Sequence, residues 1–333
     1  MARPGAGPAE RLYDLAVFLG ALAALWIVIP FGGFDAIIGD NIAQVAYWRI
    51  LFDQAFAGSV GASSMKPGLI VLLGGAHDLS LSVFHSTVLI KATFAFAGAG
   101  LATVVARIAR PVGGMIAGVG AVVYMLTQTP VTEMYVTGTS MIVFLPLLLW
   151  GVWLFSRGHD GTGAVVLCLA ALIRIEAFAV LLWLSLGEQF FKRRWRAFAL
   201  STFVVAITVV LTAAVYYRVQ GSVARFNAGG PPVGYVFARE PGGLQRLLDA
   251  LSYTASASAE MVFEQCGFPY LAIPALVAFA FSESRRYYCS LLGIPLFLLV
   301  YIGTGQGNTE VRYFQFLAPV TGATRHAVRR FGC

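Results

Sequence analysis

Long apolar runs follow one another along almost the whole chain, and they restrict what it can fold into more than any other feature. A helix crosses a bilayer with about 20 mainly apolar residues, because its own hydrogen bonds satisfy the backbone there. Only 12% of the 333 residues are charged, whereas a soluble domain carries about 25%. So few charged side chains cannot cover a water-exposed surface, and the sequence predicts an all-α polytopic membrane protein.

The apolar runs predict about ten transmembrane helices in a single transmembrane domain over residues 1–333, with no separate soluble domain. The two short runs on either side of Arg174 form either one interrupted segment or two half-buried helices. The expected spans are 14–31, 80–106, 112–129, 134–155, 163–174, 176–191, 197–217, 263–281, 287–304 and 313–324.

Basic residues occur in small clusters between these runs, as they do in the cytoplasmic loops of membrane proteins. With ten spans every cluster falls on one side, which we therefore assign to the cytoplasm together with the N-terminus. The clusters are Arg3 with Arg11, Arg107 with Arg110, Arg157, "KRRWR" at 192–196, Arg285 with Arg286, and Arg325 with Arg329 and Arg330. This distribution accounts for the net charge of +7 without a nucleic-acid partner.

Two long segments fall on the opposite, outer side. The first, at about 32–79, is rich in aromatic and aliphatic residues, and we expect it to carry interfacial helices. The second, at about 218–262, has the Gly and Pro content of a lid-like loop. Long loops in compact proteins are usually functional or disordered, and the first segment is too rich in aromatic and aliphatic residues to be disordered.

The stretch "GDNIAQVAYW" at 39–48 places several polar groups in the first outer loop. Helical spacing puts Asp40, Gln44 and Tyr47 on one stripe, which Asn41 flanks. Two interpretations of Asp40 stay open. It is either a general base that deprotonates an incoming hydroxyl at the mouth of a cavity, or a cap of the helix that begins at Asn41 or Ile42.

Two basic residues of the outer side are candidates for binding a phosphate. Lys66 precedes Pro67, which keeps the lysine extended, and an ammonium pairs with phosphate as a point charge. Arg312, next to Tyr313, opens the last apolar run and can hold a phosphate by two parallel hydrogen bonds. For both residues the alternative is a simple anchor at the membrane interface.

Arg174 and Glu176 interrupt an otherwise apolar stretch, "ALIRIEAF" at 171–178. Ionisable residues at such depth are costly, and they usually face a cavity or each other. They are therefore either part of a ligand site or a structural ion pair at the outer interface.

We expect no cofactor and no metal. The chain has no nucleotide-binding glycine loop, serine elbow or zinc motif, and its four cysteines lack metal-ligand spacing. The pair His77 and Asp78 has no further spaced partners that would complete a metal site.

Together these motifs resemble the GT-C class of integral-membrane glycosyltransferases, which includes protein O-mannosyltransferases and the lipid A aminoarabinose transferase. Four elements carry the resemblance, in the family's order and all on the outer side. They are Asp40 near the start of the first outer loop, Lys66 in "MKPGLIVLL", the "R-x-E" element of Arg174 and Glu176, and Arg312, Tyr313 and Pro319 in "RYFQFLAP".

The resemblance implies transfer of a hexosyl or pentosyl group from a polyprenyl-phosphate donor to a hydroxyl of a glycan, lipid or protein. Asp40 would be the base of an inverting displacement, and Lys66, Arg174 and Arg312 would bind the donor phosphate. Glu176, Asn41, Gln44 and Tyr313 would support them. It further implies a multi-pass protein of a bacterial inner or plasma membrane that glycosylates the cell envelope. The active site would lie on the outer face and, as in the monosaccharide-transferring branch, need no metal.

Two other functions stay open at this point. One is a transporter or flippase of a lipid-linked or polar substrate, in which Lys91 and Arg174 would be the coupling or substrate charges. The other is a non-catalytic GT-C relative that acts in an assembly, because Asn41 stands where the family often has a second acid.

Overall fold

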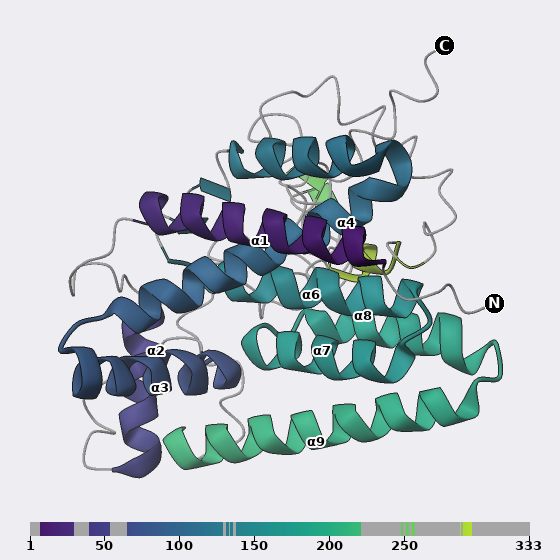
Figure 1. The fold of residues 1–333 in the computed structure, drawn as a ribbon. Coiled ribbons are helices and arrows are strands. Elements are labelled where there is room, and N and C mark those ends of the chain that lie inside the picture. Colours follow the sequence, from purple (N-terminus) through teal and green to yellow (C-terminus); the bar gives the residue numbers. More distant parts are fainter. Residues whose placement is uncertain are drawn as a thin grey trace.

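The structure is a computed structural model that describes residues 7–29, 40–53, 65–128, 131–132, 134–135 and 138–220, and short pieces at 248, 251–252, 255–256, 287 and 289–294. The regular elements of these residues are all helical (Figure 1). They are α1 (Pro8–Val28), α2 (Asp40–Phe52), α3 (Pro67–Phe84), α4 (Val88–Leu126), α6 (Met141–Ser156), α7 (Asp160–Ile173), α8 (Ala177–Leu184), the π-helix η3 (Ser185–Phe190), α9 (Trp195–Gln220) and the 3₁₀-helix η6 (Cys289–Leu292).

Four described helical segments are long and apolar enough to cross a membrane. They are Pro8–Val28, Pro67–Phe84, Val88–Pro111 and Trp195–Val219. Shorter apolar helices cover Gly114–Leu126, Met141–Ser156, Asp160–Ile173 and Ala177–Phe190. The expected class, a helical membrane protein in a lipid bilayer, is confirmed at this level. The count of ten spans is not, because most of the region after 220 lies outside the described residues.

Helix α4 reverses direction around Pro111 and Gly114. A straight helix would separate Ala106 and Gly118 by about 18 Å. A Cβ on Gly118 would instead lie 3.1 Å from the carbonyl oxygen of Ala106. Pro111 lacks a backbone N–H and Gly114 has a φ of +75°, so both residues suit a sharp bend. The two arms match the two runs expected at 80–106 and 112–129, with Arg107 close to the turn.

The start expected for the second span is wrong. Residues 80–84 belong to α3, which ends before His85, whose φ is +48°. The hydroxyl of Ser80 donates to the Ser86 carbonyl oxygen at 2.5 Å and accepts from the Leu89 N–H at 3.2 Å. These bonds hold a tight turn in the stretch "SLSVFHST" at 80–87, whose five polar residues interrupt the apolar run through which the expected span was drawn.

The stretch around Arg174 forms two separate helices that run antiparallel. Helix α7 ends at Ile173, and Arg174 is extended at φ −147° and ψ 122°. Helix α8 with η3 then returns to the beginning of α7, where Arg194 lies 2.7 Å from Asp160. The segment is therefore a hairpin, and Arg174 and Glu176 form its turn (Figure 1).

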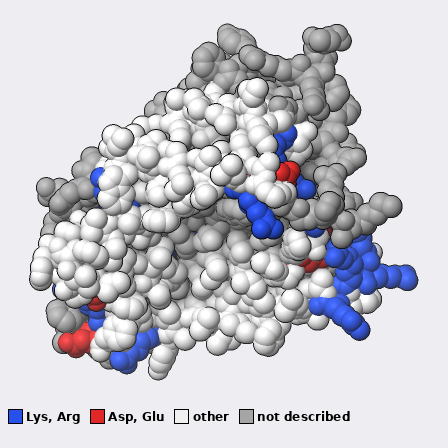
Figure 2. All heavy atoms as spheres, in the orientation of Figure 1, with Lys and Arg blue, Asp and Glu red and all other residues white. Residues whose placement is uncertain are grey.

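Basic clusters that the sequence assigns to one side lie together in space. Arg107 forms an ion pair with Asp14 at 2.8 Å and stacks on the rings of Trp150 and Trp153. Arg157 stacks on Trp153 from the end of α6. Figure 2 shows a dense group of Lys and Arg over the turn that precedes α9, at the right of the view. These contacts define a basic end of the bundle, opposite the Arg174 turn.

Helices α2 and α3 pack closely because Gly74 has no side chain. A Cβ on Gly74 would lie 2.2 Å from the Cβ of Trp48, whereas a Cβ on Gly75 would meet nothing within 4 Å. We expect Gly74→Ala to lower the free energy of unfolding by about 1–3 kcal/mol through overpacking. Gly75→Ala should be neutral or stabilising, by at most about 1 kcal/mol, since alanine favours helix. Thermal melting of the purified protein checks this pair, and equal melting temperatures would contradict the packing.

Candidate functional site

The polar stripe predicted on helix α2 faces the protein interior at Gln44 and Tyr47. Gln44 and Tyr47 are 0% and 3% exposed, whereas Arg49 and Asp53 on the other side are exposed. The face expected from helical spacing is thus confirmed for these residues. Asp40 begins α2, one helical turn before Gln44, and its side chain and that of Asn41 lie outside the described residues. Its two interpretations, base or cap, stay predictions.

Lys66 links α2 to the beginning of α3. Its backbone lies outside the helical region, at φ −127° and ψ 89°, because a following proline disfavours the α conformation. The Lys66 backbone N–H donates to the Oε1 of Gln44 at 2.9 Å. The hydroxyl of Tyr216, on α9, donates to the neighbouring Met65 carbonyl oxygen at 3.0 Å. Three elements therefore fix the position at which the lysine emerges.

Arg174 and Glu176 form an ion pair across the hairpin turn. The Nη2 and Nε of Arg174 lie 2.5 and 3.1 Å from Oε1 of Glu176, and the two side chains are only 9% and 10% exposed. The Arg174 guanidinium also lies 5.8 Å from the centre of the Phe144 ring. Of the two interpretations, the structural ion pair is present, and a further role of Arg174 in a ligand site stays a prediction.

The beginning of α3 and the end of α7 meet at this point. A Cβ on Gly68 would lie 3.0 Å from the Cβ of Leu172 and 3.2 Å from Cγ1 of Ile173. Lys66 precedes Gly68 by two residues, and Arg174 directly follows Ile173. The structure therefore brings Gln44, Lys66, Arg174 and Glu176 to one end of the bundle. We call these four residues the α3–α7 cluster. Arg312 and Tyr313 lie outside the described residues.

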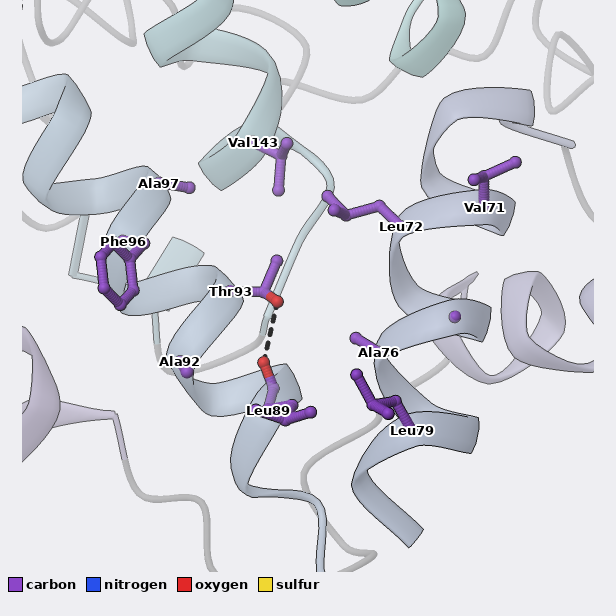
Figure 3. A pocket seen from close by; sticks show the side chains of 11 residues that line it. Val71, Leu72, Ala76, Leu79, Leu89, Ala92, Thr93, Phe96, Ala97 and Val143 are labelled. Atoms are coloured by element: carbon purple, nitrogen blue, oxygen red, sulfur yellow. Dashed lines mark hydrogen bonds between the residues drawn. The ribbon is translucent and has the colours of Figure 1, made fainter. Parts of the chain in front are cut away.

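An open apolar groove of about 660 Å³ runs between α3 and α4 (Figure 3). Among the described residues that line it, Thr93 has the one polar side chain, and its hydroxyl donates to the Leu89 carbonyl oxygen at 2.8 Å. The groove is lined by Val71, Leu72, Gly75, Ala76, Leu79, Leu89, Ala92, Thr93, Phe96, Ala97 and Val143.

The groove adjoins the α3–α7 cluster. Val143 lines the groove, and the next residue, Phe144, contacts the Arg174 guanidinium. Lys66 lies at the beginning of α3, and Val71, five residues further along the chain, lines the groove. The arrangement joins cationic groups to an apolar channel, which suits a molecule with an anionic head and a long hydrocarbon tail.

No sequence pattern indicates a role for Phe144, Val143 or Tyr216. Each lies in an apolar run without a motif, and only the packing of distant helices brings it to the cluster. His77 and Asp78 have a packing role: Asp78 accepts a hydrogen bond from Nε1 of Trp48 at 2.7 Å and lies 3.3 Å from Nδ1 of His77.

The chain was compared with protein families, with curated proteins and with solved structures. None of them matches it. The function therefore has to be inferred from the site itself.

The buried ion pair gives a direct test of the α3–α7 cluster. Glu176→Gln leaves the Arg174 guanidinium buried without its counter-charge, and we expect it to cost about 3–5 kcal/mol of stability. Glu10→Gln removes a pair at the basic end, 3.3 Å from Arg110, in which the glutamate is 43% exposed. That change should cost less than about 1 kcal/mol.

Chemical unfolding of both variants measures the difference. Replacing both partners, as in Arg174→Met with Glu176→Leu, should recover much of the lost stability, because no unpaired charge remains. Equal costs for Glu176→Gln and Glu10→Gln would show that Arg174 does not depend on Glu176.

Proposed function

We propose that the protein is a membrane-embedded glycosyltransferase that moves a sugar from a polyprenyl-phosphate donor to an acceptor hydroxyl. The observation that carries this proposal is the junction of the α3–α7 cluster with the apolar groove. A polyprenyl phosphate has the same two parts, an anionic head and a hydrocarbon tail. That the head carries a sugar, and that the protein transfers this sugar, is proposed from the GT-C-like motifs of the sequence.

The donor phosphate binds to Lys66 and Arg174 in this proposal. Glu176 holds Arg174 in place through the bonds described above, so the guanidinium loses little freedom when it binds a phosphate. Arg312, supported by Tyr313, is proposed as a third cation that binds the donor phosphate. This part of the proposal rests only on the sequence motif. The first isoprene units of the donor lie in the groove between α3 and α4, where they contact side chains such as Leu72 and Phe96.

Asp40 is the general base of the proposed reaction. Its carboxylate takes the proton of the acceptor hydroxyl as that oxygen attacks the anomeric carbon. The bond from this carbon to the phosphate oxygen breaks, the configuration inverts, and polyprenyl phosphate leaves. The developing phosphate charge is stabilised by cations that are already in position. Such preorganised electrostatic stabilisation is usually the largest contribution to the rate of an enzyme.

The proposed topology places the α3–α7 cluster on the non-cytoplasmic side of a multi-pass protein with a cytoplasmic N-terminus. The separation of the cluster from the basic end supports it, because arginines and lysines favour the cytoplasmic side. The acceptor is then a glycan, lipid or protein of the cell envelope.

Asp40→Asn tests the proposed base. The amide cannot accept the proton, and we expect the transfer rate to fall by at least about 100-fold. Asp53→Asn, at the other end of α2 and on its exposed side, is the matched control and should keep the rate. The assay supplies membrane vesicles with radiolabelled polyprenyl-phosphate hexoses and pentoses and follows label that leaves the carrier.

The two variants must insert into the membrane equally well. The amount of each variant in the membrane fraction measures this. An Asp40→Asn variant as active as Asp53→Asn would refute the role of Asp40. Absence of any transfer by the unaltered protein from the whole panel would refute the proposed activity.

A further inference from the structure

The turn between η3 and α9 presents a dense group of cations and aromatic rings. Its sequence, "FFKRRWRAF" at 190–198, holds four basic residues, and residues 191–196 are all exposed. The ring of Phe190 lies 5.5 Å from that of Phe191, 5.1 Å from that of Trp195 and 5.4 Å from that of Phe198. These residues lie at the open end of the α7–α8 hairpin, away from the Arg174 turn. We call residues 190–198 the hairpin tip.

The hairpin tip lies where a membrane-facing helix begins. Trp195–Val219 is apolar and long enough to cross a bilayer. Only 17% of the residues in its most apolar 18-residue stretch are buried inside the protein. Phe203, Val210 and Leu211 on its side are 63%, 65% and 51% exposed, as expected for contact with lipid tails. The tip, at the end of that surface, is therefore at the level of the lipid headgroups, where Trp and Tyr form interfacial belts.

Two of the four cations are already paired within the protein. Lys192 forms an ion pair with Glu188, and Nη1 of Arg194 lies 2.7 Å from Oδ2 of Asp160. These pairs tie the tip to η3 and α7. Within the residues that the structure describes, Arg193 and Arg196 have no carboxylate partner, so their charge faces outward.

Arg193 occupies a backbone position that favours glycine. Its N–H donates to the Phe190 carbonyl oxygen at 2.9 Å, and the Arg194 N–H donates to that of Gln189 at 2.7 Å. This pair of bonds is the Schellman motif that ends many helices, and its left-handed residue is usually glycine. Arg193 has a φ of +57° there, which disfavours any side chain. An arginine at this position points to a use for its guanidinium.

We propose that the hairpin tip is a binding site for an anionic phospholipid of the surrounding leaflet. Arg193 and Arg196 bind the lipid phosphate, and arginine suits this task because its planar fork donates two parallel hydrogen bonds. Phe191 and Trp195, 75% and 53% exposed, pack against the glycerol and the first carbons of the tails. Basic clusters beside a membrane helix commonly select anionic lipids. The site is independent of the glycosyltransferase proposal.

The test places the full-length protein in nanodiscs of phosphatidylcholine with phosphatidylglycerol as the minor component. The ratio of the two lipids retained after detergent extraction is measured by mass spectrometry. We expect the unaltered protein to retain more phosphatidylglycerol than its share of the bilayer. Arg193→Gly and Arg196→Gln should each lower that enrichment about fivefold. Arg11→Gln, an exposed arginine at the basic end, is the charge-matched control and should keep it.

Arg193→Gly also separates binding from folding. Glycine adopts the left-handed backbone of position 193 without steric strain. The melting temperature of the Arg193→Gly variant in pure phosphatidylcholine should therefore equal or exceed that of the unaltered protein. Enrichment unchanged in Arg193→Gly and Arg196→Gln would overturn the proposal. An equal loss in Arg11→Gln would overturn it too, because the attraction would then be a diffuse effect of net charge.

Discussion

The ion pair between Arg174 and Glu176 is the interaction on which the architecture of this protein depends. Two ionisable side chains interrupt an apolar stretch, and each could be buried there only with a partner of opposite charge. The pair stands at the turn of the α7–α8 hairpin, so the break in the helix and the burial of charge occur at the same place. Helix α3 begins against this turn, through Gly68, and brings Lys66 with it.

The hairpin also separates two chemically different ends of the bundle. At one end the α3–α7 cluster adjoins an apolar groove. At the other, arginines and lysines pair with Asp14, Asp160 and Glu188 and stack on tryptophans. The reversal of α4 at Pro111 and Gly114 keeps Arg107 at this second end. The proposed site for a lipid-linked phosphate and the proposed lipid-binding tip therefore lie at opposite ends of the bundle.

The sequence predicted the parts of the site that have local causes. Proline sterics predicted a non-helical backbone at Lys66, and helical spacing predicted that Gln44 and Tyr47 share one face. The cost of buried charge indicated that Arg174 and Glu176 face either each other or a cavity. It could not predict the groove or the contact with Phe144, because these need the packing of helices far apart in the chain. The turn at His85 was missed because the expected span was drawn through the polar stretch "SLSVFHST" at 80–87, where the Ser80 hydroxyl holds the turn. The side chain of Asp40 and the residues Arg312 and Tyr313 lie outside what the structure describes, so their roles stay predictions.

The two ends of the α7–α8 hairpin should be accessible from opposite sides of the membrane, and a membrane-impermeant reagent tests this placement. Single cysteines at Ile175, which is 37% exposed, and at Arg193 report on the two ends in a protein whose four native cysteines are replaced by serine. Sealed right-side-out vesicles are treated with a membrane-impermeant maleimide. Opposite placement of the two ends predicts labelling of Ile175→Cys in intact vesicles, and labelling of Arg193→Cys only after the vesicles are opened. Labelling of both from the same side would contradict it, because the Arg174 turn and the basic end would then share one face.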